Sequence, residues 1–153
     1  MIEDALDMSR IENNKFETQI EAFDPRACLA EVCSIMNFQA TQKQLSLIHK
    51  VKEGVPQYLK SDSKRYKQVL FNLLGNAVKF TFKGGITVTL DYITDEAAAK
   101  KPILRTTVSD TGIGIKAEEI KKLFQFFGRV TSSKHLNRGG MGFGLSISKM
   151  IVQ

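Results

Sequence analysis

Apolar residues recur along the chain with two different periods, and the changes of period predict alternating helices and strands. A helical period is loose over residues 1–15 and clear over residues 25–43. Asp24 and Pro25 are typical of an N-cap and a first helical residue. The apolar stripe of this second helix consists of Leu29, Val32, Cys33, Met36 and Ala40. We therefore expect that stripe to face a core.

Strand-like alternation and β-branched residues mark several extended segments. They are residues 16–23, 45–51, 86–93 and 103–109, with a shorter extended piece around Tyr58 after a turn at Gly54 and Pro56. A polar segment, residues 94–102, connects the last two strands.

Three further helices are predicted, over residues 63–80, 116–124 and 142–152. Asp62 or Ser61 can cap the first of them, and Gly84 and Gly85 stop it. A polar, glycine-containing loop over residues 128–140 separates the other two. The order of elements indicates an α+β fold, a two-layer sandwich with helices on one face of a sheet.

Length and composition indicate one folded domain: the chain has 153 residues, of which 42% are hydrophobic and 25% charged. Cys28 and Cys33 have no partners at metal-ligand spacing, so we expect reduced core residues. No apolar run approaches the roughly 20 residues that span a bilayer, and no export signal is visible. These features predict that this piece is cytoplasmic and not in a membrane, and they leave open a membrane anchor in a longer parent protein.

The net charge of +6 raises nucleic acid as a possible partner. However, the basic residues are spread from Lys43 to Lys149 without a dense block and without aromatic interleaving. The charge therefore indicates a general attraction for anions, such as a nucleotide triphosphate, and no nucleic acid partner.

The helix over residues 63–80 carries an unusual polar arc. Two asparagines one turn apart are unfavourable in a helix interior and need a reason. Their amide oxygens suit Mg²⁺, and Lys79 adds charge for phosphates. The alternative is an arc that faces bulk water. The arc consists of Arg65, Gln68, Asn72, Asn76 and Lys79.

Two glycine-containing segments add candidate chemistry. Asp110 ends a predicted strand, and its carboxylate can accept a hydrogen bond from an exocyclic amine such as that of adenine. Gly112 and Gly114 permit close backbone approach, although an ordinary strand-to-helix turn is the alternative. The glycines of residues 139–144 precede a helix, where free amides bind anions. They match neither a Walker loop nor a dinucleotide fingerprint.

The four motifs together resemble the nucleotide-binding boxes of sensor histidine kinases. Residues 72–81 (NLLGNAVKFT) are similar to the N box and residues 110–115 (DTGIGI) to the G1 box. Residues 123–127 (LFQFF) are similar to the F box and residues 139–145 (GGMGFGL) to the G2 box. Residues 2–12 resemble the last turns of the preceding dimerisation helix. The resemblance thus assigns residues 1–15 to that helix and residues 16–153 to the catalytic domain.

This resemblance implies a Bergerat-type fold with a mixed sheet, and ATP and Mg²⁺ as cofactors. Asn76 would be the principal Mg²⁺ ligand with Asn72 beside it, and Asp110 would bind the adenine amine. The loop of residues 128–140 would be a lid whose Arg129, Lys134, His135 and Arg138 either reach phosphates or are solvated. The expected nucleotide-binding residues are Asn72, Asn76, Lys79, Asp110, Gly112, Gly114, Phe127, Arg138, Gly140, Gly142, Gly144 and Leu145.

The reaction expected from the resemblance is phosphoryl transfer. Clamp-type ATPases of the same fold carry a glutamate where this chain has Asn72, and an amide cannot act as a general base. Neither His49 nor His135 has the acidic neighbour of an acceptor, so the acceptor histidine and any certain catalytic residue are absent. The family's last strands are expected to be missing after Gln153.

The expected partners follow from the same resemblance. They are the dimerisation and phosphoacceptor domain of a parent kinase, itself a homodimer, and a response-regulator receiver domain. Two alternatives remain: a nucleotide-binding or interaction module without catalysis, and a clamp-type ATPase.

Overall fold

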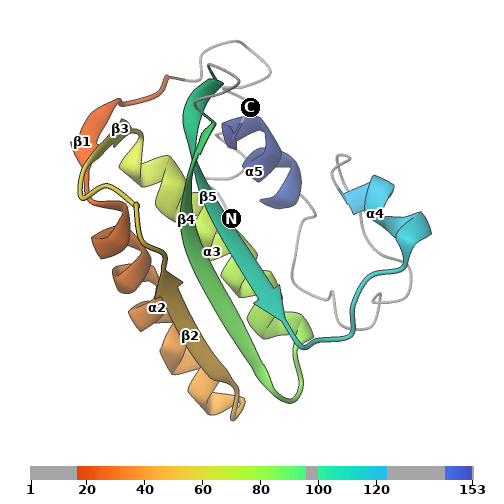
Figure 1. Cartoon of the computed structure of the whole chain (residues 1–153). Coiled ribbons are helices and arrows are strands. Elements are labelled where there is room, and N and C mark those ends of the chain that lie inside the picture. Colours follow the sequence, from red (N-terminus) through yellow and green to blue (C-terminus); the bar gives the residue numbers. More distant parts are fainter. Residues whose placement is uncertain (1–16, 96–99, 124–143, 153) are drawn as a thin grey trace. The chain divides into compact units, whose positions relative to one another are not determined.

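The computed structural model describes residues 17–95, 100–123 and 144–152, which divide into two compact units (Figure 1). The larger unit is Gln19–Ile113. The smaller contains helices α4 (Ala117–Leu123) and α5 (Gly144–Val152). The predicted helix over residues 1–15, with its domain boundary, and the predicted loop over residues 128–140 lie outside the described residues.

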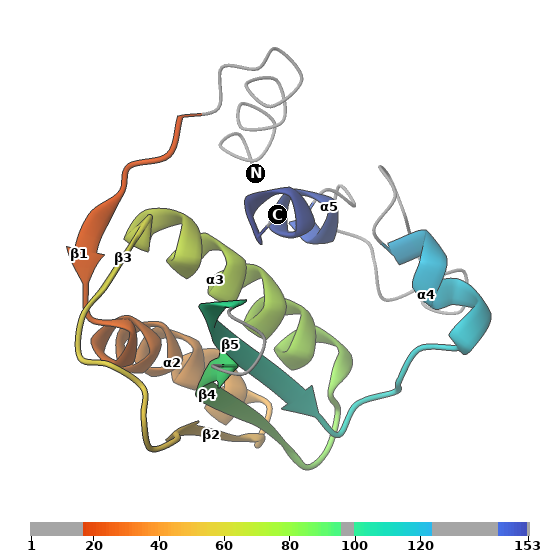
Figure 2. The ribbon, with the colours of Figure 1, turned by 45° about the horizontal axis from the view of Figure 1, so that its top comes forward.

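The larger unit contains a mixed sheet, in which β2 runs parallel to β4 and β4 antiparallel to β5. β1 and β3 form a separate antiparallel pair. Helices α2 and α3 lie on one face of the mixed sheet (Figure 2), which confirms the predicted α+β arrangement. The elements are β1 (Glu21–Phe23), α2 (Pro25–Gln42), β2 (Ser46–Val51), β3 (Leu59–Ser61), α3 (Ser63–Phe80), β4 (Gly85–Asp95) and β5 (Lys100–Asp110).

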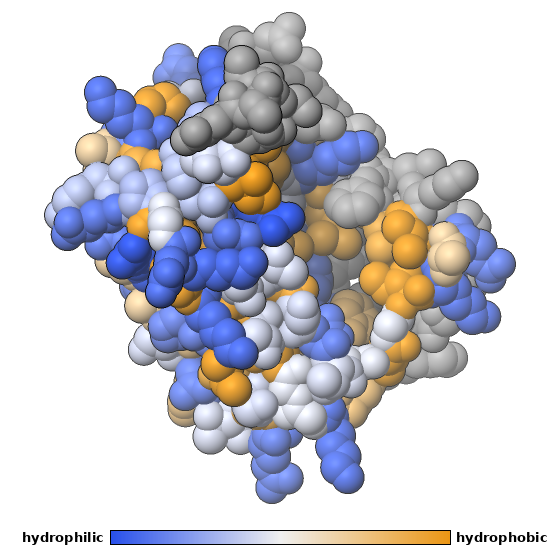
Figure 3. Space-filling view, in the orientation of Figure 1, coloured by the Kyte–Doolittle hydropathy of each residue, from blue (hydrophilic) through white to orange (hydrophobic). Residues whose placement is uncertain are grey.

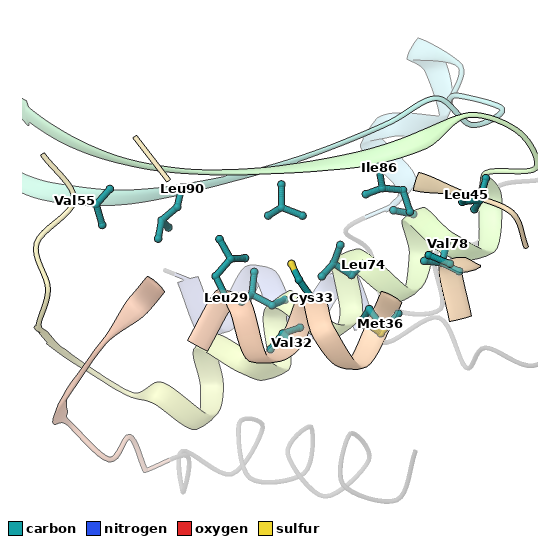
Figure 4. Packing of buried hydrophobic residues seen from close by; sticks show 14 residues of the cluster. Leu29, Val32, Cys33, Met36, Leu45, Val55, Leu74, Val78, Ile86 and Leu90 are labelled. Carbon is teal, nitrogen blue, oxygen red and sulfur yellow. The ribbon is translucent and has the colours of Figure 1, made fainter. Parts of the chain in front are cut away.

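The core lies between this sheet and the two helices (Figure 4). Alternate residues of β4, namely Ile86, Val88 and Leu90, are buried against the helices. Leu70 and Leu74 of α3 are also fully buried. Each such side chain contributes about 1.5–3 kcal/mol of hydrophobic free energy. All five predicted residues of the α2 stripe are buried, so that prediction is confirmed.

Both cysteines lie on the buried side of α2 and are free thiols. Burial raises the pKa of Cys28 and of Cys33, which keeps the thiols protonated and poorly reactive. The prediction of reduced core residues is confirmed.

Aspartates cap both long helices. The Asp24 carboxylate accepts hydrogen bonds from the backbone N–H groups of Arg26 and Ala27, at 2.8 and 3.1 Å. Of the two candidate caps of α3, the structure selects Asp62, whose Oδ1 accepts from the Arg65 N–H at 2.9 Å. Helix α3 covers residues 63–80 as predicted, and its C-cap is Thr81, in extended conformation, which precedes the expected glycines.

The prediction of a strand over residues 16–23 was wrong in part. Of the described residues 17–23, only Glu21–Phe23 form a strand, β1, and Ile20 before it is 63% exposed. Among the described strands, β1 pairs with β3, whose three residues match Glu21–Phe23 and leave residues 17–20 without a strand partner. By contrast, β4 and β5 are longer than predicted and extend into the polar segment, where Asp95 pairs with Lys100.

The outer face of the mixed sheet is largely polar (Figure 3), as is usual for a sheet with one face in water. On β4, the Asp91 carboxylate accepts from Arg105 of β5 at 2.7 Å and from Lys52, just after β2, at 3.0 Å. The hydrogen bonds from Arg105 and Lys52 hold the pKa of Asp91 below its ordinary value. None of the described helices combines the length and the apolar character needed to cross a bilayer.

Candidate nucleotide-binding site

Helix α3 presents the polar arc that the sequence predicted. Asn72, Asn76 and Lys79 are each half-buried, so they are neither core residues nor fully solvated. The side-chain amide group of Asn76 makes no hydrogen bond with any other described residue. Arg65, at the start of the arc, is buried and donates to Gln68 Oε1 at 2.8 Å. The two asparagines therefore lie one turn apart on a partly sheltered helix face.

Asp110 is the last residue of β5 and lies opposite Ile86 of β4. Its Oδ1 accepts a hydrogen bond from the Gly112 N–H at 2.8 Å. The aspartate side chain is thus held by the turn that follows it, and it remains exposed. One carboxylate oxygen is bound within the turn, and the other oxygen can accept a hydrogen bond from a ligand.

The Asp110 turn packs directly on the C-terminal end of α3 (Figures 1 and 2). The Ile113 N–H donates to the Phe80 carbonyl at 3.3 Å. A Cβ atom on Gly112 would lie 2.6 Å from that carbonyl oxygen, so only glycine fits. At Gly112 the closely approaching backbone is that of the chain's own helix, and the approach to a nucleotide stays a prediction. Gly114 instead has a positive φ of 66°, with open space around it.

Thr111 was not predicted, although it fastens this turn to the start of β4. Its hydroxyl donates to the Lys83 carbonyl at 2.9 Å and accepts from the Gly85 N–H at 3.0 Å. A threonine between a strand-ending acid and a glycine is a recognisable turn signal, because its hydroxyl can bond nearby backbone. Gly84 makes room for this threonine and has a φ of 100°.

A second residue missed by sequence reasoning is Lys43, at the end of α2. Its ammonium group contacts the carbonyls that end α3, including Val78 at 2.6 Å. No local pattern predicts this contact, because the two residues are 35 positions apart.

The structure therefore brings together the α3 and β5 parts of the predicted site. Gly144 and Leu145 begin α5, in the smaller unit. Phe127, Arg138, Gly140 and Gly142 lie outside the described residues, as do Arg129, Lys134 and His135. The part of all these predicted residues in nucleotide binding, including Asn72, Asn76 and Asp110, stays a prediction. His49 lies in β2, as expected.

The domain is a two-layer α+β domain of the Bergerat type. Its mixed sheet is covered on one face by helices, and the turn after Asp110 packs on the end of α3, the helix that carries the two asparagines. The chain belongs to the family of histidine kinase-, DNA gyrase B- and HSP90-like ATPases, whose pattern matches residues 61–153. ATP binding is the activity that this membership implies.

The relatives of the chain confirm the resemblance to histidine kinases. It is 36% identical over 154 residues to Two-component system protein A of Emericella nidulans, matching 100% of this chain and 22% of the relative. It is 38% identical over 152 residues to Hybrid signal transduction histidine kinase L of Dictyostelium discoideum, matching 99% of this chain and 9% of the relative. The chain thus spans less than a quarter of the length of either relative.

The fold is similar to that in the crystal structure of full-length ShkA in complex with AMPPNP. The TM-score is 0.81 at 28% sequence identity, covering 98% of this chain and 29% of that chain.

Proposed function

We propose that this chain is the ATP-binding catalytic part of a two-component sensor histidine kinase. It transfers the γ-phosphoryl group of ATP to a histidine on a dimerisation and phosphoacceptor domain. The observation that carries the proposal is the Asp110 turn, which the bond from Ile113 to Phe80 fastens to the end of the helix bearing Asn72 and Asn76. An acceptor for the adenine amine and hard oxygen ligands are thereby built on adjoining elements.

In this proposal Asp110 recognises the base. The Gly112 N–H donates to Asp110 Oδ1 at 2.8 Å and so orients the carboxylate. The other oxygen, Oδ2, accepts a hydrogen bond from the exocyclic amine of adenine. The Asp110 carboxylate can only accept hydrogen bonds. A base with a carbonyl oxygen in place of the adenine amine would therefore be repelled by the carboxylate oxygen. This arrangement favours ATP over GTP.

The residues of α3 fit a magnesium ion shared with the nucleotide phosphates. In the part of the chain that the structure describes, no group of three or more His, Cys, Asp or Glu side chains is placed to hold a metal. The amide oxygens of Asn76 and Asn72 are hard, neutral ligands, suited to an ion whose remaining ligands are phosphate oxygens and water. When bound, Mg²⁺ neutralises charge on the phosphates and orients them. Lys79 adds a positive charge on the same helix face.

The chemistry that follows is phosphoryl transfer rather than hydrolysis. Asn72 stands where a hydrolase would need a base to activate water, and an amide does not accept a proton at neutral pH. The acceptor imidazole nitrogen forms a bond to the γ-phosphorus, and the bond to the β,γ-bridging oxygen breaks, with its electron pair leaving on ADP. Positioning and charge neutralisation drive such a step, and the glycines of residues 140–144 supply amides for the phosphates.

The partners belong to the same proposal. They are the phosphoacceptor domain of a homodimeric parent kinase and a receiver domain that takes the phosphoryl group from it. The chain works on the cytoplasmic side, where ATP is available.

Calorimetric titration with a non-hydrolysable ATP analogue, with and without Mg²⁺, tests the binding site. Asp110→Asn is expected to weaken binding at least about tenfold under both conditions, because its single amide oxygen stays with the Gly112 N–H and the NH2 group then faces the adenine amine. Asn76→Ala is expected to abolish the increase in affinity that Mg²⁺ produces. Asn37→Ala makes the same change on the exposed side of α2 and serves as the matched control. Equal affinity in all four proteins would contradict the site.

The transfer step is tested by supplying a histidine-bearing dimerisation helix pair in trans with γ-labelled ATP. Acid-labile label is expected on that helix pair and not on His49 or His135 of this chain. Phosphate release without labelling would instead identify a clamp-type ATPase. Binding without either reaction would identify a nucleotide-binding module.

A further inference from the structure

The C-terminal end of α3 is held by donors from three different places. The last carbonyls of any α-helix lack partners within the helix, so other groups must satisfy them. Here the Ala77 carbonyl accepts from the Thr81 N–H at 3.0 Å, and the Phe80 carbonyl accepts from the Ile113 N–H at 3.3 Å. The remaining carbonyls of this end face Lys43.

Lys43 bonds to three carbonyls at once. Its Nζ lies 2.6 Å from the Val78 oxygen, 3.1 Å from the Lys79 oxygen and 3.4 Å from the Thr81 oxygen. An ammonium group has three donors, so this set uses all of them. Its positive charge also lies at the negative end of the helix dipole, where it is stabilising. The ring of Phe82, 5.3 Å from the same nitrogen, adds a cation–π contact.

The base of Lys43 is itself held in place. Lys43 is the C-cap of α2, and its backbone N–H donates to the carbonyls of Ala40 and Thr41. The lysine therefore connects the end of one core helix to the end of the other. A second connection between these helices, from Lys67 to Glu31 at 2.6 Å, joins the second turn of α3 to α2, far from the C-terminal end that Lys43 holds.

The helix end that Lys43 holds is the one on which the Asp110 turn packs. Phe80 receives the hydrogen bond of Ile113, and its carbonyl also sets the space available at Gly112. Movement of this last turn would displace the turn that orients the Asp110 carboxylate. No hydrogen bond joins the Lys43 side chain to Asp110, Asn72 or Asn76 among the described residues, so its influence passes through the helix end.

We propose that Lys43 is a positioning residue of the nucleotide site, which holds the last turn of α3 so that the Asp110 turn keeps its place for adenine. The proposal rests on the proposed function, since it assigns Asp110 to the base. It predicts that loss of the Lys43 side chain lowers the affinity for every adenine nucleotide by the same factor, whatever the number of phosphates.

The test compares Lys43→Met, Lys43→Arg and Lys67→Met in the full chain. Lys43→Met keeps the length of the side chain and removes its donors and charge. We expect affinity for ADP and for a non-hydrolysable ATP analogue to fall by the same factor, about threefold to tenfold. Without nucleotide, amide exchange at Ile113, followed by NMR, is expected to become faster by about the same factor. Lys43→Arg keeps the charge and is expected to recover most of both losses.

Lys67→Met is the matched control, because it removes the other connection between α2 and α3 and is expected to change neither measurement. The proposal would be overturned if folded Lys43→Met matched the unmodified chain, or if Lys67→Met reproduced its effects. A loss confined to the ATP analogue would also overturn it, since that result would place the lysine at the γ-phosphate. If the unmodified chain bound no nucleotide, the proposed function would fail, and exchange at Ile113 would still report whether Lys43 holds the helix end.

Discussion

At position 112 the chain has room for a hydrogen atom and for nothing larger. A Cβ atom there would lie 2.6 Å from the Phe80 carbonyl oxygen and 2.7 Å from Asp110 Oδ1. The first of these atoms belongs to backbone that ends a helix, and the second to the carboxylate assigned to adenine. This glycine therefore links the packing of the fold to the geometry of the site.

Gly112→Ala is expected to lower the free energy of unfolding by about 1–3 kcal/mol, because the turn must move away from α3. We expect binding of an ATP analogue to weaken at least about tenfold at the same time, as Asp110 moves with the turn. The matched change is Gly75→Ala, within α3, where a Cβ atom meets nothing within 4 Å. It is expected to stabilise the chain by about 0.5–1 kcal/mol. Urea unfolding and calorimetry measure both; a neutral Gly112→Ala would contradict the close approach.

At the scale of elements, α3 connects the rest of the larger unit through both of its ends. At its start, Asp62 Oδ2 accepts from the Gln19 N–H at 2.9 Å, which fastens the segment leading into β1. At its end, Lys43 and Ile113 bring in α2 and the end of β5. The strands have a comparable connection on the outer sheet face. There the carboxylate of Asp91, on β4, accepts hydrogen bonds from Arg105 of β5 and from Lys52, just after β2.

The Asp91 cluster predicts a dependence of stability on pH. The pKa of Asp91 in the folded chain is lowered from its ordinary value of 3.8, first by Arg105 and then by Lys52. The carboxylate therefore contributes stability above that ordinary value, and the contribution is lost as the pH falls through the folded pKa. Asp91→Asn is expected to destabilise the chain at neutral pH and to differ little from the unmodified chain at strongly acid pH.

Urea unfolding at a series of pH values and salt concentrations measures this difference, which added salt should reduce because the two cations, Lys52 and Arg105, are exposed. Glu53→Gln, which removes an exposed carboxylate outside the cluster, is the control. A stability difference between Asp91→Asn and the unmodified chain that stayed constant across the acid range would show that the carboxylate charge is not involved.

At the scale of the whole molecule, the residues of the hydrophobic core occupy one stretch of the chain, and the residues of the proposed nucleotide site extend beyond that stretch. Every residue of the buried core cluster, from Leu29 to Leu90, lies within Gln19–Ile113. The glycines assigned to the phosphates, residues 140–144, lie beyond that unit. Folding and nucleotide binding are therefore expected to depend on different lengths of chain.

A fragment comprising residues 19–113 is expected to unfold cooperatively, because it keeps the entire cluster, and to bind the ATP analogue at least about tenfold more weakly than the full chain. Circular dichroism during heating and calorimetry measure the two properties. A fragment without a cooperative transition would show that the core needs the smaller unit. A fragment with full affinity would remove the glycines from the site.

Much of this arrangement was predictable because it depends on neighbours along the chain. The stripe of α2 repeats with the helical period, and Asp24 and Asp62 cap residues two or three positions away. Prediction failed at residues 17–20, where alternation alone indicated a strand. Whether those residues form a strand depends on a neighbouring strand to pair with, and β3 has only three residues, which pair with Glu21–Phe23.

The sequence by itself determined the class of fold and the family, and it supplied the residues of the proposed site, because periodicity, caps and motif spacing depend on consecutive residues. Only the tertiary structure decided that Gly112 and Ile113 pack on Phe80, that Thr111 fastens the same turn to β4, and that Lys43 holds the end of α3. These contacts join residues about 26 to 38 positions apart along the chain. Such pairs meet only after the helices have packed on the sheet, since hydrophobic burial brings the elements together without specifying which polar groups come into contact at their ends.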